Sequence, residues 1–136
     1  MLPAKELPQL FDSIVNALSA REDTKAYVKG LLLAYVEGPK DLSTESITLR
    51  YAAVREKPSF VGFQELADWL FFSRSIFPDH AADFAGLYEA MGQSAYYRCH
   101  LLLRKEWPLF GELSRGFGDL VTQLQESSAH LAVGSS

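Results

Sequence analysis

Residues 59–77 read SFVGFQELADWLFFSRSIF and form the longest densely apolar segment of the chain. Its apolar side chains lie on two helical faces, one with Phe63, Leu66, Ala67, Leu70 and Phe77, the other with Trp69, Phe72 and Ile76. A helix that is apolar around most of its circumference is buried on most sides. Ser59 suits the N-cap position, and Pro78 ends the pattern. We therefore expect a central, mostly buried helix, the fourth in the chain.

Prolines divide the chain on both sides of this stretch, at positions 8, 39, 58, 78 and 108. Proline suits the first turn of a helix and breaks a helix interior, so these positions indicate helix boundaries. Apolar residues recur with the helical period between them, which predicts helices near residues 7–18, 23–35, 42–56, 59–77, 81–105 and 108–126. The predicted fold is all-α: a single-domain bundle of five or six helices over residues 1–126, followed by a weakly ordered tail, residues 127–136.

Residues 42–56 are the ambiguous segment. Ile47, Tyr51 and Val54 keep helical spacing, whereas Ile47, Leu49, Tyr51 and Ala53 alternate as in a strand. A lone strand would have no partner for its backbone groups among helices. We therefore expect residues 47–53 to be helical, with a strand as the alternative.

The fifth predicted helix, residues 81–105, carries two stripes. The expected core stripe consists of Phe84, Leu87, Tyr88, Met91, Ala95, Cys99 and Leu102, and the expected polar stripe of Glu89, Gln93, Tyr96 and His100. Gly86 and Gly92 each cost a helix interior about 1 kcal/mol relative to alanine. Two such residues indicate a close approach of another helix, or a bend.

Composition limits the possible functions. The 136 residues are 48% hydrophobic and include 13 basic and 17 acidic side chains, for a net charge of −4. Because a nucleic-acid binder normally shows a basic footprint, we expect no nucleic-acid partner. The longest apolar run, residues 31–36, is too short to span a membrane, and the N-terminus lacks the pattern of a signal peptide. A cytoplasmic location is the resulting expectation.

The sequence holds no motif for catalysis or metal binding. A single cysteine, Cys99, excludes intrachain disulfides and covalent c-type haem. Cys99 and His100 are adjacent, so on a helix they point about 100° apart and do not form a nucleophile–base pair. Glu-x-x-His is absent, which excludes the di-iron bundles, and Asp79, His80 and Asp83 are typical of a helix start. We expect no catalytic residues, no metal site and no cofactor.

Arg74 is the most informative single residue, because it lies among apolar neighbours on the fourth helix. Either a carboxylate such as Asp68, Glu89 or Glu65 pairs with it, or it lines a cavity and meets an external anion. We expect the structural pair, because an unpaired buried charge costs several kcal/mol. In the alternative, Arg74, Tyr97 and His100 are the ligand-binding residues of a pocket between the fourth and fifth helices.

Residues 66–79, LADWLFFSRSIFPD, and the later Tyr88, Met91–Gly92 and Ala95–Tyr96 form a pattern that resembles uncharacterised helical proteins of bacteria. The resemblance covers about residues 59–125. It implies a bacterial origin and an all-α fold, and it brings no activity and no site residues.

The leading hypothesis is a non-catalytic module that acts through protein–protein contacts, with a homodimer as the expected state. Its basis is the lack of catalytic motifs and an aromatic content larger than a small bundle readily buries. The alternative is a protein or enzyme that binds haem or another small ligand in the pocket described above. A helix-turn-helix DNA binder is disfavoured by the net charge and by the lack of a basic recognition helix.

Overall fold

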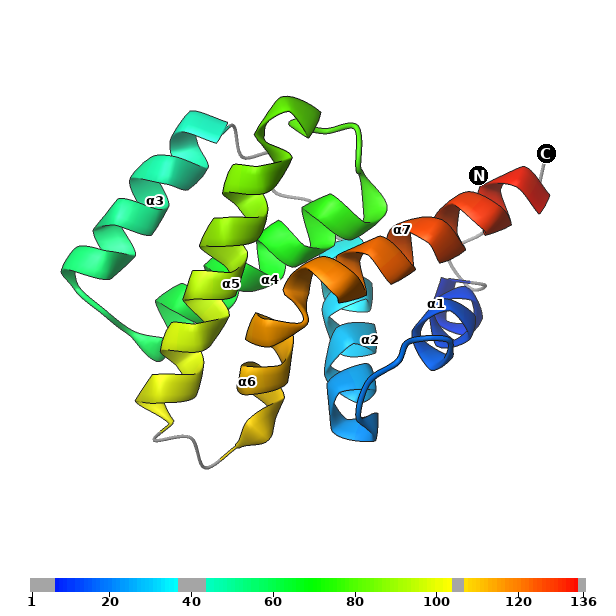
Figure 1. Cartoon of the computed structure of the whole chain (residues 1–136), viewed down its shortest axis with the longest axis horizontal. Coiled ribbons are helices and arrows are strands. Elements are labelled where there is room, and N and C mark those ends of the chain that lie inside the picture. Colours follow the sequence, from blue (N-terminus) through cyan, green and yellow to red (C-terminus); the bar gives the residue numbers. More distant parts are fainter. Residues whose placement is uncertain (1–6, 37–43, 104–106, 135–136) are drawn as a thin grey trace.

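The computed structural model describes residues 7–36, 44–103 and 107–134, and within them every regular element is a helix (Figure 1). The α-helices are α1 (Leu7–Asn16), α2 (Glu22–Val36), α3 (Thr44–Glu56), α4 (Phe60–Ile76), α5 (Ala85–Leu102), α6 (Pro108–Arg115) and α7 (Phe117–Gly134). A short 3-10 helix, η2 (Ala82–Phe84), precedes α5. The prediction of an all-α protein is confirmed.

Helix α4 lies at the centre of the fold. Its most extensive interface is with α5, and α7, α3 and α2 also pack against it (Figure 1). From Leu66 to Ser75 every residue except Asp68 is buried. The expectation of a central, mostly buried fourth helix is confirmed, with Asp68 as the polar exception within it. Phe77, which was assigned to one of its apolar faces, instead follows the helix as its C-cap and is 51% exposed.

Ser59 caps α4 as predicted. Its backbone is extended, and its Oγ accepts a hydrogen bond of 3.0 Å from the Gly62 N–H. The cap satisfies one of the N–H groups that the first turn of a helix leaves without an intrahelical partner.

Replacing Ser59 with alanine is expected to lower the free energy of unfolding by about 1 kcal/mol, because the Gly62 N–H loses its acceptor. Urea unfolding measures the change. Ser59→Gly is the matched control and is expected to cost only a few tenths of a kcal/mol, since glycine itself favours the N-cap. Equal losses in the two variants would contradict the capping role.

The ambiguous segment, residues 47–53, is helical and lies within α3. Ile47 is fully buried, whereas Leu49 is 65% exposed. The strand alternative would have placed both residues on one face. The helical interpretation is therefore confirmed.

The helix count differs from the prediction of five or six. The last predicted helix is two helices, α6 and α7, which meet at Gly116, so the described residues contain seven α-helices. The apolar stripe continues from Phe110 to Leu124, and a continuous stripe cannot reveal a break within it. The helix was also expected to end near Glu126, whereas α7 continues to Gly134.

The rotation of α5 also differs from the prediction. Phe84, Leu87 and Leu102 were assigned to the core, but their side chains are 49, 43 and 47% exposed. Tyr96 was assigned to the polar stripe, yet it is fully buried. The reason lies at Gly92, where a Cβ atom would come within 2.3 Å of the Phe117 ring. The close approach predicted from the glycines is confirmed at Gly92, and it turns the Gly92–Tyr96 side of α5 inward.

Candidate functional site

Arg74 lies at the end of α4 and is only 7% exposed. Its Nη1 donates a 2.8 Å hydrogen bond to the Pro78 carbonyl, and its own carbonyl accepts from Gln125 Nε2 at 2.6 Å. Its buried Nε has no hydrogen-bond partner in the described part of the chain. No described carboxylate lies within ion-pair distance, so the expected pairing with Asp68, Glu65 or Glu89 is wrong. The Pro78 carbonyl takes the place of the carboxylate.

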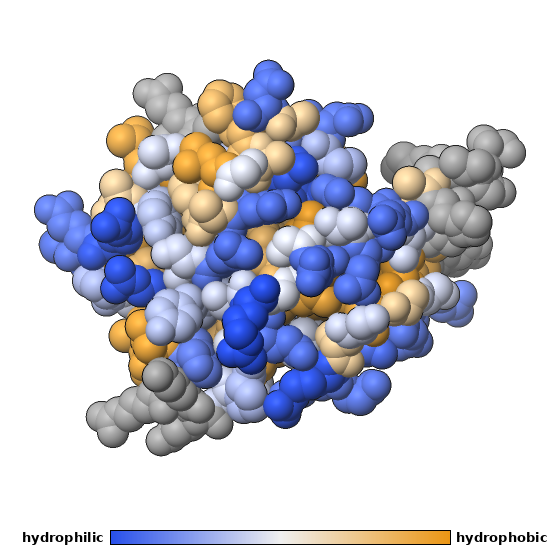
Figure 2. Space-filling view, in the orientation of Figure 1, coloured by the Kyte–Doolittle hydropathy of each residue, from blue (hydrophilic) through white to orange (hydrophobic). Residues whose placement is uncertain are grey.

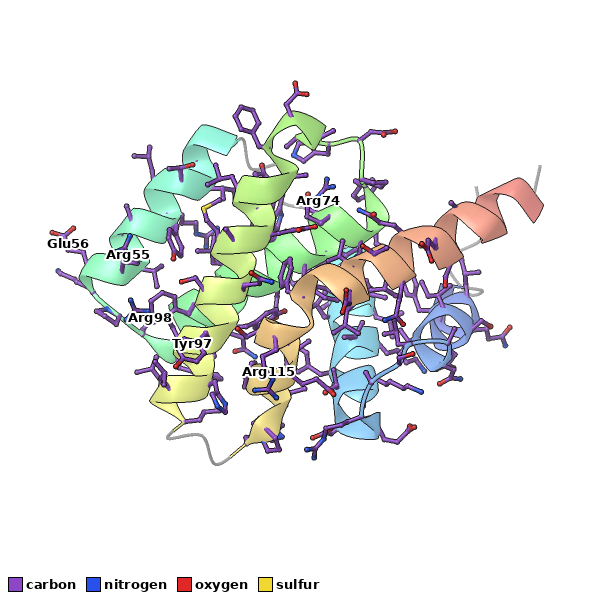
Figure 3. The ribbon with its side chains drawn as sticks, in the orientation of Figure 1. Arg55, Glu56, Arg74, Tyr97, Arg98 and Arg115 are labelled. Carbon is purple, nitrogen blue, oxygen red and sulfur yellow. The ribbon has the colours of Figure 1, made fainter. Side chains whose placement is uncertain are left out.

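Tyr97 and His100 are neighbours on α5, with ring centroids 6.3 Å apart. Tyr97 is 49% exposed, and the His100 imidazole packs over Gly111 of α6. Figure 3 places Tyr97 and Arg74 toward opposite ends of the paired helices α4 and α5. The structure therefore does not bring Arg74 together with Tyr97 and His100. Aromatic pairs between α4 and α5, such as Phe71 with Tyr96, fill the space in which the alternative hypothesis placed a ligand pocket.

Asp68, rather than Arg74, is the residue on which hydrogen bonds from other helices converge. The Tyr27 hydroxyl of α2 donates to its carboxylate, at 2.7 Å from Oδ1 and 2.9 Å from Oδ2. The Tyr96 hydroxyl of α5 donates to Oδ1 at 2.7 Å. Gln64 Nε2 completes the network by donating to the Tyr27 oxygen at 2.9 Å. These four residues, here called the Asp68 network, connect α2, α4 and α5.

Burial raises the pKa of Asp68 to about 6, because the carboxylate loses water that its two tyrosine donors replace only in part. The Tyr96 and Tyr27 hydrogen bonds favour the charged form and lower the pKa, while the nearby Glu65 raises it. Burial, together with the Asp68 charge, also raises the pKa of both tyrosines well above the usual value. Asp68 is therefore the member of the network that titrates near neutrality.

The Cys99 thiol lies beside the network and is buried. Burial and the Asp68 charge raise the pKa of Cys99 to about 12, so the thiol stays protonated. Its Sγ lies 3.8 Å from the Phe60 carbonyl, to which the S–H donates. These features match the expected role of Cys99 as an unreactive core residue.

A pocket of about 320 Å³ opens beside the Asp68 network, between α2 and α4. Its lining residues are Ala26, Tyr27, Gly30, Leu31, Ala34, Tyr35, Gln64 and Asp68. Tyr35 is held in place by a 3.3 Å hydrogen bond to the Glu65 carbonyl and by stacking on Phe72. The pocket thus combines two tyrosine rings, small side chains and one carboxylate.

The sequence pattern indicated Asp68 only as a partner for Arg74, and the roles of Tyr27, Gln64 and Tyr96 were not predicted. A signal existed for Tyr96, which follows Gly92 by four residues on one helical face. Where a glycine lets a neighbouring helix approach closely, that helix also covers the residue one turn further along the same face. No comparable signal pointed to Tyr27, which lies 41 residues from Asp68 in the chain.

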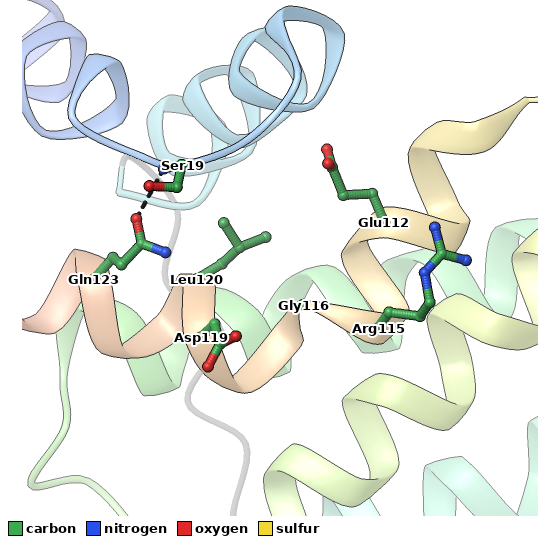
Figure 4. Close-up of a pocket in the computed structure, with 7 residues that line it drawn as sticks. All are labelled: Ser19, Glu112, Arg115, Gly116, Asp119, Leu120 and Gln123. Atoms are coloured by element: carbon green, nitrogen blue, oxygen red, sulfur yellow. Dashed lines mark hydrogen bonds between the residues drawn. The ribbon is translucent and has the colours of Figure 1, made fainter.

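A second pocket, of about 340 Å³, lies where α6 and α7 meet the connection between α1 and α2 (Figure 4). Two of the side chains that line it accept hydrogen bonds from the backbone of that connection. The Ser19 N–H donates to Gln123 Oε1 at 2.9 Å, and the Arg21 N–H donates to Glu112 Oε1 at 3.2 Å. We interpret this pocket as a structural junction.

The outward face of α5 carries apolar side chains that are partly exposed to solvent. Leu87, Tyr97 and Leu101 are 43, 49 and 40% exposed, and Ala90 between them is also exposed. Figure 2 shows apolar patches at both ends of α5. Ser94, in the middle of this face, is half-buried, and its Oγ accepts from the Tyr51 hydroxyl at 2.6 Å, so α3 borders the face on one side.

Comparison with known proteins finds no matching family model, no similar curated protein and no similar solved structure. Within the described ranges, no group of three or more His, Cys, Asp or Glu side chains is arranged to hold a metal ion. No helix of the described segments has the length and apolarity needed to cross a membrane. The two features of the described segments that could bind a partner or a ligand are the Asp68 pocket and the outward face of α5.

Proposed function

We propose that the protein acts through protein–protein contacts and that its partner is a second copy of this chain, bound through the outward face of α5. The observation that carries this proposal is the spacing of that face. Leu87, Ala90, Ser94, Tyr97 and Leu101 follow one another at alternating steps of three and four residues. This spacing is typical of the contact positions in paired helices, where each helix inserts its side chains between those of the other.

The face is also complementary to itself. An antiparallel pair with its two-fold axis at Ser94 places Leu87 opposite the partner's Leu101. In this register the small Ala90 lies within about one residue of the position opposite the partner's Tyr97, which is a large side chain. A two-fold contact uses the same patch on both copies, so this alternation of large and small side chains lets one sequence fill both halves of the interface.

The interface is small, since one helix of this length supplies most of it. Stable complexes usually bury about 1,200–2,000 Å² of surface in total. We therefore expect a dimer that forms at micromolar rather than nanomolar concentration. The apolar exposure on α5 is the driving force, because these side chains leave water when the copies meet.

Light scattering at tens of micromolar protein is expected to give twice the chain mass of 15.2 kDa. The Leu101→Glu variant is expected to give the monomer mass, because a buried, unpaired carboxylate would face the partner's Leu87. Leu49→Glu is the matched control, since Leu49 is 65% exposed but lies on α3, outside this face. It should remain dimeric. A monomeric parent, or a Leu101→Glu variant as dimeric as the parent, would overturn the proposal.

A further inference from the structure

We propose that the pocket beside Asp68 binds a small organic amine in its protonated, ammonium form. The pocket lies between α2 and α4, so this inference is independent of the contact proposed for α5. It rests on the charge of Asp68, the arrangement of its hydrogen bonds and the lining of the pocket.

The Asp68 charge has no cationic partner in the described part of the chain. Both of its donors are tyrosine hydroxyls, which are neutral. The nearby Arg50 lies against Glu65 instead, with Nη2 at 3.8 Å from Oε2. Charges that are largely buried are normally paired with an opposite charge. A cation that enters from the pocket would supply the missing one.

The carboxylate also has acceptor capacity to spare. An ionised carboxylate offers about four acceptor positions. Tyr96 donates to Oδ1, and Tyr27 shares its single proton between Oδ1 and Oδ2. Oδ2 therefore has room for a further donor. An alkylammonium carries N–H donors and a positive charge on the same atom, and its hydrogen bond to a carboxylate is of the strong, charge-assisted kind.

The walls of the pocket suit the carbon chain of such a ligand. Ala26, Gly30 and Ala34 recur every four residues along α2, and a Cβ atom at Gly30 would meet nothing within 4 Å. The rings of Tyr27 and Tyr35 add aromatic surface, which attracts cations. The volume of about 320 Å³ is at the small end of ligand pockets, which favours an alkylamine over a nucleotide.

Binding should depend on pH through Asp68. The groups around it are Tyr27 and Tyr35 of α2, Glu65 of α4, and Tyr96 and Cys99 of α5. Burial keeps the tyrosines and the thiol protonated at neutral pH, so Asp68, with a pKa of about 6, is the group whose charge changes. Affinity for an ammonium is expected to fall about tenfold for each pH unit below that value.

The test is calorimetric titration of the full chain with n-butylammonium chloride at neutral to mildly alkaline pH. We expect saturable binding at one site per chain, and none by 1-butanol, which has nearly the same shape without the charge. Asp68→Asn should weaken binding at least about tenfold, since it removes the charge and its charge-assisted hydrogen bond. Glu65→Gln is the matched control, a carboxylate on the same helix that does not line the pocket, and it should bind like the parent.

A second variant tests the pocket without touching the network. Gly30→Leu places a side chain into open space on an exposed part of α2, so the fold is retained while the pocket is filled. It should abolish binding. Equal affinity for butanol and butylammonium, or binding that survives both Asp68→Asn and Gly30→Leu, would overturn the proposal, as would the absence of binding to the parent protein.

Discussion

Replacing Asp68 with asparagine is expected to stabilise the protein relative to the parent by about 2–3 kcal/mol more at about pH 8 than at about pH 4. The pKa of Asp68 rises from 3.8 to about 6 on folding, so the folded protein holds this proton more tightly than the unfolded chain. The stability that Asp68 contributes is therefore fully present below about pH 4 and is lost as the pH rises through about 6. Asparagine carries no charge and removes this dependence. Urea unfolding of both proteins at the two pH values measures the difference.

A second substitution separates this effect from a general loss of packing. Tyr96→Phe removes a hydrogen bond that lowers the pKa of Asp68. The pKa should then rise further, and the pH range over which stability is lost should move upward. If the stability difference between the parent and Asp68→Asn is the same at both pH values, the burial of the Asp68 charge has no energetic consequence and this account is wrong.

Replacing Gly92 with alanine is expected to lower the free energy of unfolding by about 1–3 kcal/mol, the usual range for overpacking a core. The new Cβ would lie 2.3 Å from two carbons of the Phe117 ring. That ring has little room to move aside, because it is fully buried, packs edge-on against Phe71 at 5.4 Å and lies tilted against Tyr96 at 5.9 Å between ring centroids. Thermal or urea unfolding measures the loss.

Gly86→Ala is the control on the same helix. A Cβ atom there meets nothing within 4 Å, so only the helix propensity changes. Alanine is the better helix former, and the variant should be as stable as the parent or more stable by up to about 1 kcal/mol. A Gly92→Ala protein that gains stability in the same way would show that α5 and α7 do not meet closely at this point.

Much of the fold is local and was predictable. Helix formation depends on residues three and four positions apart, so apolar spacing and prolines located the helices, and the Ser59 cap followed from its place before the pattern. The same spacing identified α4 as buried, because apolar residues on two faces leave no wide polar face for solvent. Gly86 and Gly92 together indicated a close approach or a bend, and the structure shows a close approach at Gly92 but open space at Gly86.

The candidate site was less predictable. Arg74 stood out because a charge among apolar residues needs a partner, but a carbonyl four residues away supplies one, and the sequence pattern does not distinguish a carbonyl from a carboxylate. The expected core positions on α5 were wrong at Phe84, Leu87 and Leu102 for a related reason. Periodicity shows that a helix has an apolar stripe, yet its neighbours decide which part of a wide stripe faces the core.

The helical class, most helix positions and the burial of α4 therefore followed from the order of residues, since each depends on neighbours along the chain. Two features became visible only in the folded chain: the last predicted helix divides at Gly116, and Tyr27, Asp68 and Tyr96 meet. Asp68 is 41 residues from Tyr27 and 28 from Tyr96, and such a meeting depends on how three helices rotate and slide against one another. Those rotations are set by side-chain packing across the whole core, and packing between distant segments leaves no periodic signal in the chain.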